Sequence, residues 1–283
     1  MSKPEWAEDP APLLAAGDGF QLSKIDPRST PGFDGGKQDG ERLLAAEAPA
    51  ISELQERLYA ESRSGGTRRV LLILQAMDTA GKGGVIRHVV GAIDPQGTKI
   101  YGFKKPTPEE LAHDFLWRVR RQVPGPGIVG VFDRSHYEDV LIARVRQLAP
   151  PDEIEARYDQ IVEFENELIA DGTTIIKAML HISAEEQKAR LAERLDRADK
   201  HWKYNPGDID ERLLWSDYQH AYQMALDRTS TPQSPWFVVP ADRKWFARIA
   251  VQRLLLDALR TLDPQWPKAT FDVAAEKKRL AAS

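Results

Sequence analysis

A glycine-rich segment in the first third of the chain has the composition of a phosphate-binding loop. It reads Gln75-Ala-Met-Asp-Thr-Ala-Gly-Lys-Gly-Gly84 and follows an apolar run of strand length. Between a strand and a helix, such a loop binds phosphate because the backbone N–H groups at a helix N-terminus carry partial positive charge. Glycines let that backbone approach phosphate oxygens, and the lysine adds a mobile cation. The predicted phosphate-binding residues of this segment are Ala80, Gly81, Lys82, Gly83, Gly84 and, just beyond them, Arg87.

The loop departs from the usual G-x-x-x-x-G-K-[ST] pattern in two places. Gln75 or Ala76 stands where the first glycine is expected, and Gly83 replaces the hydroxyl residue that follows the lysine. That hydroxyl normally helps to hold Mg²⁺, so the metal must be anchored elsewhere, and Asp78 inside the loop is the candidate. The alternative is a glycine-rich turn that only packs a helix closely against a strand.

A second acidic position follows another apolar run, Ile128–Phe132, and is occupied by Asp133. Ligands of open α/β sheets bind at the carboxyl ends of the strands, where this side chain is expected. Oxygen ligands suit Mg²⁺, so Asp78 and Asp133 are predicted to hold Mg²⁺, with Mn²⁺ as an alternative. Asp133 could instead orient or deprotonate the attacking phosphate oxygen, or simply cap a helix. Arg134 is placed to bind a phosphate.

Glu138 and Asp139 lie about one turn beyond Asp133. We expect both carboxylates to face the same cleft. The alternative for both is a solvated helix face.

A basic segment after residue 181 resembles the lid of nucleoside monophosphate kinases, in which arginines close over the transferred phosphate. Arg190, Arg194 and Arg197 are spaced so that they can share one helix face, and Lys203 continues the cluster. Lys104 could extend the same basic track. Closure of a lid would exclude water and neutralise developing charge. The alternative is a set of surface ion pairs with neighbouring carboxylates.

We assign the predicted site residues to two groups. The catalytic group is Asp78, Lys82, Asp133, Arg134 and Arg194. The second group, which binds phosphate or nucleotide, adds Glu138, Asp139, Lys104, Arg190, Arg197 and Lys203 to the loop residues.

These residues need a frame of alternating strands and helices. Predicted strands cover 69–75, 98–103, 128–132, 173–180 and 235–239, and predicted helices cover 50–62, 108–121, 152–169, 184–195, 211–226 and 242–262. Such alternation predicts an α/β fold with a parallel sheet and helices on both faces, a P-loop kinase-like three-layer sandwich with a helical lid. We expect an irregular N-terminal arm (1–50), a phosphotransferase domain (51–265, with the lid at about 184–212) and a C-terminal tail (266–283).

Composition sets outer limits on the function. The chain has 283 residues, a formal net charge of −4 and no cysteine. The charge argues against non-specific nucleic-acid binding, and the lack of cysteine excludes disulfides and zinc–thiolate sites. No apolar run approaches the roughly 20 residues that span a bilayer, and the polar start does not have the pattern of a secretory signal. We therefore expect a cytoplasmic protein that binds neither nucleic acid nor membranes.

Taken together, these segments resemble the polyphosphate kinase 2 family from about residue 35 to 245. The matching pieces are Gln75–Gly84, Phe132–Val140, Glu163–Glu165, Arg190–Lys203, Trp215–Tyr218 and Ser234–Asp242. The segment Ser135–Asp139 looks like the class III branch, which phosphorylates both nucleoside monophosphates and diphosphates.

The resemblance implies an in-line, Mg²⁺-assisted phosphoryl transfer from inorganic polyphosphate to AMP or ADP, giving ADP or ATP, with guanine nucleotides as further acceptors. It also suggests a dimer or a tetramer. Some class III members carry Asn at the position of Asp133, so the choice between a metal ligand and an acceptor-orienting group stays open. Two other functions are compatible with the sequence: an ATP-dependent kinase of the same fold, and a polyphosphate- or nucleotide-binding protein without turnover.

Overall fold

The computed structural model describes residues 5–283 and contains a five-stranded parallel sheet in the order β2-β3-β1-β4-β5. The strands are β1 (Arg69–Ala76), β2 (Thr98–Gly102), β3 (Val129–Asp133), β4 (Thr173–His181) and β5 (Trp236–Pro240). Every residue of the central strand β1 is buried, as expected for a parallel sheet covered on both faces. The predicted fold class is therefore confirmed.

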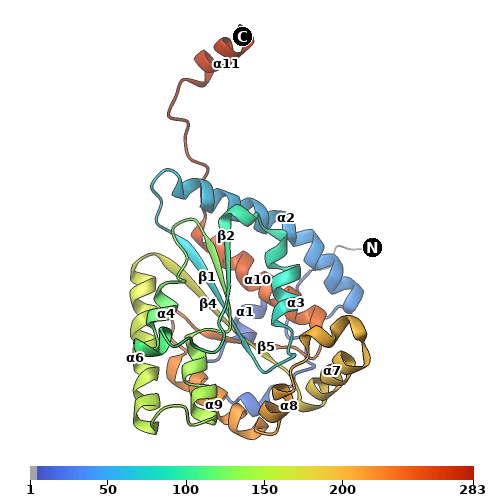
Figure 1. Ribbon diagram of the computed structural model, residues 1–283. Helices are drawn as coiled ribbons and strands as arrows, with labels where there is room; N and C mark the ends of the chain where they lie inside the picture. The colour runs from blue at the N-terminus through green and yellow to red at the C-terminus, as the bar shows by residue number, and fades with distance from the viewer. Residues whose placement is uncertain (1–4) are drawn as a thin grey trace.

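Helices lie on both sides of this sheet. The helices are α1 (Pro10–Leu14), α2 (Lys37–Ser62), α3 (Lys82–His88), α4 (Trp117–Arg120), α5 (Ile142–Val145), α6 (Pro151–Ala170), α7 (Ala184–Asp196), α8 (Gly207–Arg212), α9 (Trp215–Thr229), α10 (Lys244–Leu262) and α11 (Val273–Ala281). Figure 1 shows α2, α3 and α10 on one side of the sheet and α6 and α9 on the other. No helix within residues 5–283 is long and apolar enough to cross a membrane.

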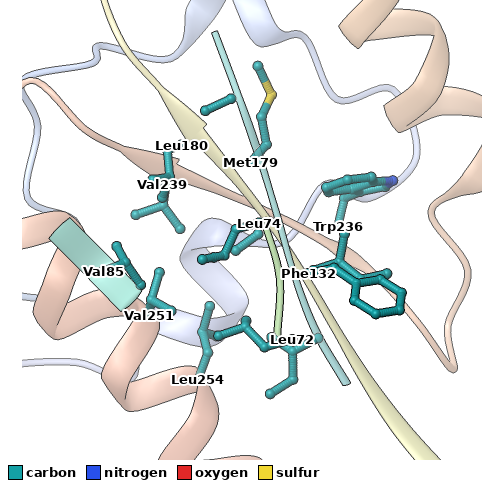
Figure 2. Packing of buried hydrophobic residues seen from close by; sticks show 14 of the residues in the cluster. Leu72, Leu74, Val85, Phe132, Met179, Leu180, Trp236, Val239, Val251 and Leu254 are labelled. Carbon is teal, nitrogen blue, oxygen red and sulfur yellow. The ribbon is translucent and has the colours of Figure 1, made fainter. Parts of the chain in front are cut away.

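The core forms where α3 and α10 press against the central strands. Leu74 of β1 lies with Val85 of α3 and with Val251 and Leu254 of α10, and Trp236 lies across the strands from them (Figure 2). All five side chains are buried. Burial of each aliphatic side chain contributes about 1.5–3 kcal/mol, so this contact fixes α3, and with it the loop before α3, against the sheet.

The N-terminal segment is more helical than expected. Helix α2 begins at Lys37 and runs without a break through residue 50, where the sequence predicted a boundary between an arm and a domain. Its start is marked by Asp39, whose carboxylate accepts a hydrogen bond from the Gly36 N–H at 3.0 Å. Pro49 obscured this helix in the sequence, because proline removes a backbone donor in the helix interior.

Two further segments differ from the predicted elements. The helix expected over 108–121 is a 3₁₀ turn, η4 (Glu110–Ala112), followed by the short α4. Thr107 and Glu110 form reciprocal capping hydrogen bonds, but Asp114 accepts a hydrogen bond from the Leu116 N–H and starts a new turn. Between the predicted helices at 184–195 and 211–226, where no element was predicted, the chain forms the 3₁₀ helix η6 (Ala198–Lys203) and the start of α8.

Candidate active site

The phosphate-binding loop connects β1 to α3. Helix α3 begins at Lys82, and Gly81 in front of it has a φ of 125° that L side chains rarely adopt. Thr79 is also left-handed, with a φ of 67°. The Gly84 N–H donates to the Gly81 carbonyl at 2.8 Å, which closes the first turn. The predicted order of a strand, a glycine-rich turn and a helix is confirmed, and the helix begins at the lysine itself.

The side chain of Arg190 binds the backbone of this loop. Its guanidinium donates hydrogen bonds to the carbonyls of Thr79 and Ala80 at 3.0 and 2.8 Å, and also to the carbonyls of Ala241 and Asp242. The side chain is only 5% exposed. This differs from the expectation that Arg190 contacts phosphate: its donors are used by backbone carbonyls and by the Glu186 carboxylate, so it stabilises the shape of the loop.

The two acidic positions and the lysine lie together at the carboxyl edge of the sheet. Strand register pairs Leu74 of β1 with Asp133 of β3, so Asp133 stands beside the start of the loop. Asp78, Lys82 and Asp133 all line one cleft of about 750 Å³. The arrangement required by the sequence hypothesis, with Lys82 and Asp133 at the same edge, is therefore present.

The cleft is strongly basic. Eight basic side chains line it: Lys82, Arg87, His88, Lys104, Arg134, Arg194, Lys203 and Arg248. Its carboxylates are Asp78 and Asp133. Within residues 5–283, two donor groups at this cleft, the Arg248 Nε and the Thr79 hydroxyl, are buried without a hydrogen-bond partner. Unpaired donors and a surplus of cations suit an extended polyanion such as a phosphate chain.

Arg134 connects the loop to the acidic strand end. Its guanidinium donates to the Asp78 carboxylate at 2.8 Å, and its backbone is left-handed with a φ of 65°. Although burial opposes the charge, the carboxylates of Glu138 and Asp78 raise the pKa of Arg134. Strained non-glycine backbone at Thr79 and Arg134 lies within the same cleft, and such strain is concentrated at functional sites.

Comparison with known proteins decides the family. The sequence profile of polyphosphate kinase 2 matches residues 35–267. The chain is 46% identical to an AMP/ADP-polyphosphate phosphotransferase of Meiothermus ruber, over 91% of this chain and 94% of that one. It is 41% identical to an ADP-polyphosphate phosphotransferase of Rhodopseudomonas palustris, over 91% and 89%.

The chain belongs to the polyphosphate kinase 2 family. A crystal structure of polyphosphate kinase 2 from Arthrobacter aurescens TC1 matches with a TM-score of 0.98 and 57% identity, covering 100% of both chains. A putative polyphosphate kinase 2 from Pseudomonas aeruginosa matches with a TM-score of 0.77 and 32% identity, over 85% of this chain and 50% of the other. The resemblance found in the sequence is thus confirmed.

Two carboxylates of the cleft, Asp78 and Asp133, have the oxygen donors that suit a magnesium ion. No group of three or more His, Cys, Asp or Glu residues within 5–283 is arranged to hold a metal by itself. Mg²⁺ is commonly bound by one or two carboxylates together with waters and substrate phosphates. Asp78 and Asp133 supply such a pair at the edge of a basic cleft.

Two basic residues of the cleft were missed from the sequence. Arg248 comes from α10, and His88 ends α3. Burial, together with the nearby Arg248 and Arg87, lowers the pKa of His88, and burial together with Arg87 lowers that of Arg248, partly offset by Glu41. Neither residue belongs to a motif. The packing of α10 on α3 brings Arg248 to the loop, and no local sequence signal indicates that contact, whereas His88 lies on α3 itself.

A smaller cavity of about 220 Å³ adjoins the basic cleft. Asp78 and Arg134 line both spaces, and Glu138, Tyr218 and Tyr222 line only the small one. Burial raises the pKa of Glu138, although Arg134 and Lys82 oppose this change. The sequence analysis expected Glu138 in the same cleft as Asp133, whereas the structure places it in the adjoining cavity.

Asp139 and Arg197 are not brought to the cleft. Asp139 lines a separate cavity, where its carboxylate accepts a hydrogen bond from Arg118 at 3.3 Å and lies 3.9 Å from Arg157. Glu138 and Asp139 are adjacent in η5 (His136–Asp139), which is a 3₁₀ helix. Adjacent side chains of a 3₁₀ helix point in different directions, so these two carboxylates line different cavities. Arg197 is half-exposed and pairs with Glu193 and Asp199. Surface ion pairing, which was the alternative for these arginines, describes Arg197.

Arg194 and Lys203 of the lid do line the cleft. Arg194 donates to the Lys203 carbonyl at 2.9 Å and to the Asp208 carboxylate at 3.1 Å. These contacts tie the end of α7 to η6 and α8. Trp202, between them in the chain, also lines the cleft and is 78% exposed.

A buried polar network supports the segment that carries Asp133 and Glu138. Glu165 of α6 and Lys177 of β4 form an ion pair at 2.6 Å, and both side chains are buried. Tyr137 donates to Glu165 at 2.8 Å, and His136 lies 3.3 Å from the same carboxylate. The resemblance pointed to Glu163–Glu165, and the structure shows the physical reason: Glu165 anchors η5.

Proposed function

We propose that this enzyme transfers phosphoryl groups from inorganic polyphosphate to AMP and ADP, giving ADP and ATP. The observation that carries the proposal is the single cleft in which Asp78, Lys82 and Asp133 lie among eight basic side chains. A mononucleotide needs fewer cations than this cleft offers, whereas a polyphosphate chain carries about one charge per phosphate along its length. The names of the relatives from Meiothermus ruber and Rhodopseudomonas palustris support the same pair of substrates.

In the proposed reaction, a phosphate oxygen of the acceptor attacks the terminal phosphorus of polyphosphate. The bond from that phosphorus to the next bridging oxygen breaks, and the shortened chain leaves with the electron pair. A phosphate monoester at neutral pH is already largely ionised, because its second pKa is about 6, so the enzyme needs no strong base. Catalysis is then positioning and electrostatic stabilisation, without a covalent intermediate.

The residues have distinct roles in this proposal. The loop backbone and Lys82 hold the terminal phosphates, and Arg194 and Lys203 bind the chain from the lid side. Arg134 lies between the two spaces and stabilises the charge of the transferred group. Asp78 and Asp133 would hold Mg²⁺, which neutralises charge on the phosphate oxygens when it is bound. The small cavity beside Glu138 would receive the acceptor, with Glu138 contributing to the acceptor preference.

The deciding experiment compares donors with one purified protein. Polyphosphate, Mg²⁺ and AMP are incubated with the enzyme, ADP replaces AMP in a second reaction, and ATP replaces polyphosphate in a third that contains AMP. Chromatography should show ADP and then ATP when polyphosphate is the donor. Turnover with ATP alone would favour an ATP-dependent kinase. Bound polyphosphate without transfer in a single-turnover reaction would favour a binding protein.

A matched pair of lysine variants links this activity to the cleft. Lys82→Ala should lower the polyphosphate-dependent rate by at least roughly 100-fold, the loss found for one preorganised electrostatic group. Lys188→Ala removes an exposed lysine of α7 that does not line the cleft, so its rate should be unchanged. Full activity in Lys82→Ala would refute the site assignment.

A further inference from the structure

The tail, residues 266–283, leaves the body of the molecule. Figure 1 shows an extended stretch after α10 that carries α11 away from the other helices. Every residue from Gln265 to Ser283 is exposed. The base of the tail is held at α2, where the Arg57 guanidinium lies 5.9 Å from the Trp266 ring.

The tail nevertheless carries large apolar side chains of the kind that pack against another surface. Trp266, Phe271, Val273 and Leu280 are 50%, 61%, 45% and 77% exposed. Val273 and Leu280 are seven residues apart, so they share one face of α11. Asp272 caps this helix. Its carboxylate accepts hydrogen bonds from the N–H groups of Ala274 and Ala275 at 2.9 and 3.0 Å. A helix of 9 residues is marginal in water, so α11 needs an apolar surface to pack against.

The relative's crystal structure contains the tail in the same place. The match to the Arthrobacter chain covers 100% of both chains with a TM-score of 0.98. Each of the 283 residues can contribute at most the same share to a TM-score. If residues 266–283 lay elsewhere in that structure, the score could not reach 0.98. A segment whose only anchor on its own chain is at its base therefore lies in a similar place in two related proteins, as expected if it packs against another molecule.

Charge identifies the kind of surface that suits the tail. The tail contains the cations Lys268, Lys277, Lys278 and Arg279 and the carboxylates Asp272 and Glu276. It is therefore net +2, and residues 1–265 carry net −6 of the total of −4. The body of another copy of this chain is thus oppositely charged to the tail, which favours their association.

The tail leaves from the edge of the sheet opposite to the cleft. Helix α10 ends at Leu262, whose carbonyl accepts a hydrogen bond from Arg68, the residue before β1. The cleft instead lies at the carboxyl end of β1. The tail therefore does not cover the cleft of its own chain, and its removal should leave the catalytic residues in place.

We propose that the tail packs on a second copy of this chain, with Phe271, Val273 and Leu280 buried in the contact between the two. The partner is thus another copy of this chain, and the tail is an arm that joins subunits. Independently of what the enzyme phosphorylates, this assigns the tail a role in assembly.

Light scattering after size-exclusion chromatography tests the proposal. The full chain should have at least twice the mass of 31.8 kDa of one copy. A chain that ends after Gln265, and the full-length double variant Phe271→Ser/Leu280→Ser, should both form smaller assemblies. A chain that ends after Ala281 loses two residues but keeps the apolar face, so it should assemble like the full chain. A monomeric full chain, or an unchanged mass in the truncated chain and the double variant, overturns the proposal.

Photo-crosslinking identifies what the tail contacts. A photoreactive phenylalanine analogue replaces Phe271, and ¹⁵N-labelled and unlabelled chains are mixed before irradiation. Mass spectrometry should find crosslinked peptides that join a labelled to an unlabelled chain. Crosslinks confined to single chains, or to another protein when a cell extract is added, would contradict the contact between two copies.

Discussion

Asp133 and Asp139 are six residues apart in the chain, but their surroundings give them different roles. Asp133 ends a strand at the basic cleft, where it is half-buried and faces the space between the phosphate loop and the lid. Asp139 is held by Arg118 and Arg157 in another cavity. Burial raises the pKa of Asp139, although both arginines oppose this change. One carboxylate is thus available to a ligand, and the other is part of the internal structure.

The same substitution should therefore lower catalytic activity at one of these positions and stability at the other. Asp133→Ala should lower kcat for AMP phosphorylation by roughly 100-fold or more, because a preorganised polar group beside the transferred group is lost. Asp139→Ala should keep kcat near that of the parent enzyme but lower the melting temperature, because two arginines lose their partner. Initial rates and thermal unfolding measured on both variants check this. Equal losses of kcat in the two would contradict the separation of roles.

Arg248 and Arg197 offer a second comparison between arginines. Arg248 lines the cleft with a buried Nε that has no partner within residues 5–283, whereas Arg197 is paired on the surface. Arg248→Met should raise the KM for polyphosphate about 10-fold, since a hydrogen bond to a charged group contributes about 1.5–3 kcal/mol.

Arg197→Met is the matched control, and its KM should stay within about twofold because exposed ion pairs contribute little. Steady-state kinetics with polyphosphate varied at saturating AMP measure both values. A larger rise in KM for Arg197→Met than for Arg248→Met would mean that the lid closes far enough to bring Arg197 to the phosphate chain.

At the scale of elements, η5 depends on a buried ion pair that lies outside the cleft. Glu165 and Lys177 come from α6 and β4, and Tyr137 of η5 donates to Glu165. Burial alone would raise the pKa of Glu165, but Lys177 and His136 outweigh it and lower that pKa. A carboxyl group whose pKa is lowered on folding stabilises the protein above its unfolded pKa. Stability should thus be lost as the pH falls below about 4.5 through the folded pKa.

Breaking this pair on one side should unfold the protein more easily than replacing both partners. Lys177→Met leaves the Glu165 carboxylate buried without its cation, which should cost roughly 3–5 kcal/mol of unfolding free energy. Adding Glu165→Gln to this variant removes the charge, keeps an acceptor for Tyr137, and should recover most of the loss. Urea unfolding at pH 7 measures both. A loss below about 1 kcal/mol in Lys177→Met would show that the pair does not anchor η5.

At the scale of the whole molecule, the sequence predicted the positions of those site residues that depend only on neighbouring residues and on the order of the strands. Lys82 and Asp133 could be placed together because both follow buried strands, and parallel strands end at one edge. Arg190 and Arg194 could be placed on one helix, but the direction of that helix relative to the loop depends on packing. Arg248 gave no signal, because its position depends on a contact between α3 and α10 far apart in sequence.

The uneven distribution of charge leads to a final prediction about ionic strength. The chain is net −4, yet seven lysine and arginine side chains gather in the cleft beside two carboxylates. Such a focused field attracts a polyanion and is screened when the Debye length falls from about 10 Å at 0.1 M salt to about 3 Å at 1 M. The kcat/KM for polyphosphate should therefore fall steeply with added KCl, and the value for AMP at saturating polyphosphate should fall less, because AMP carries fewer charges. Arg248→Met should show a shallower dependence on KCl than the parent enzyme, while Arg197→Met should match the parent. If all the slopes were equal, including that for AMP, salt would be acting on the fold or on Mg²⁺ binding, and the cleft would not be the source of the attraction.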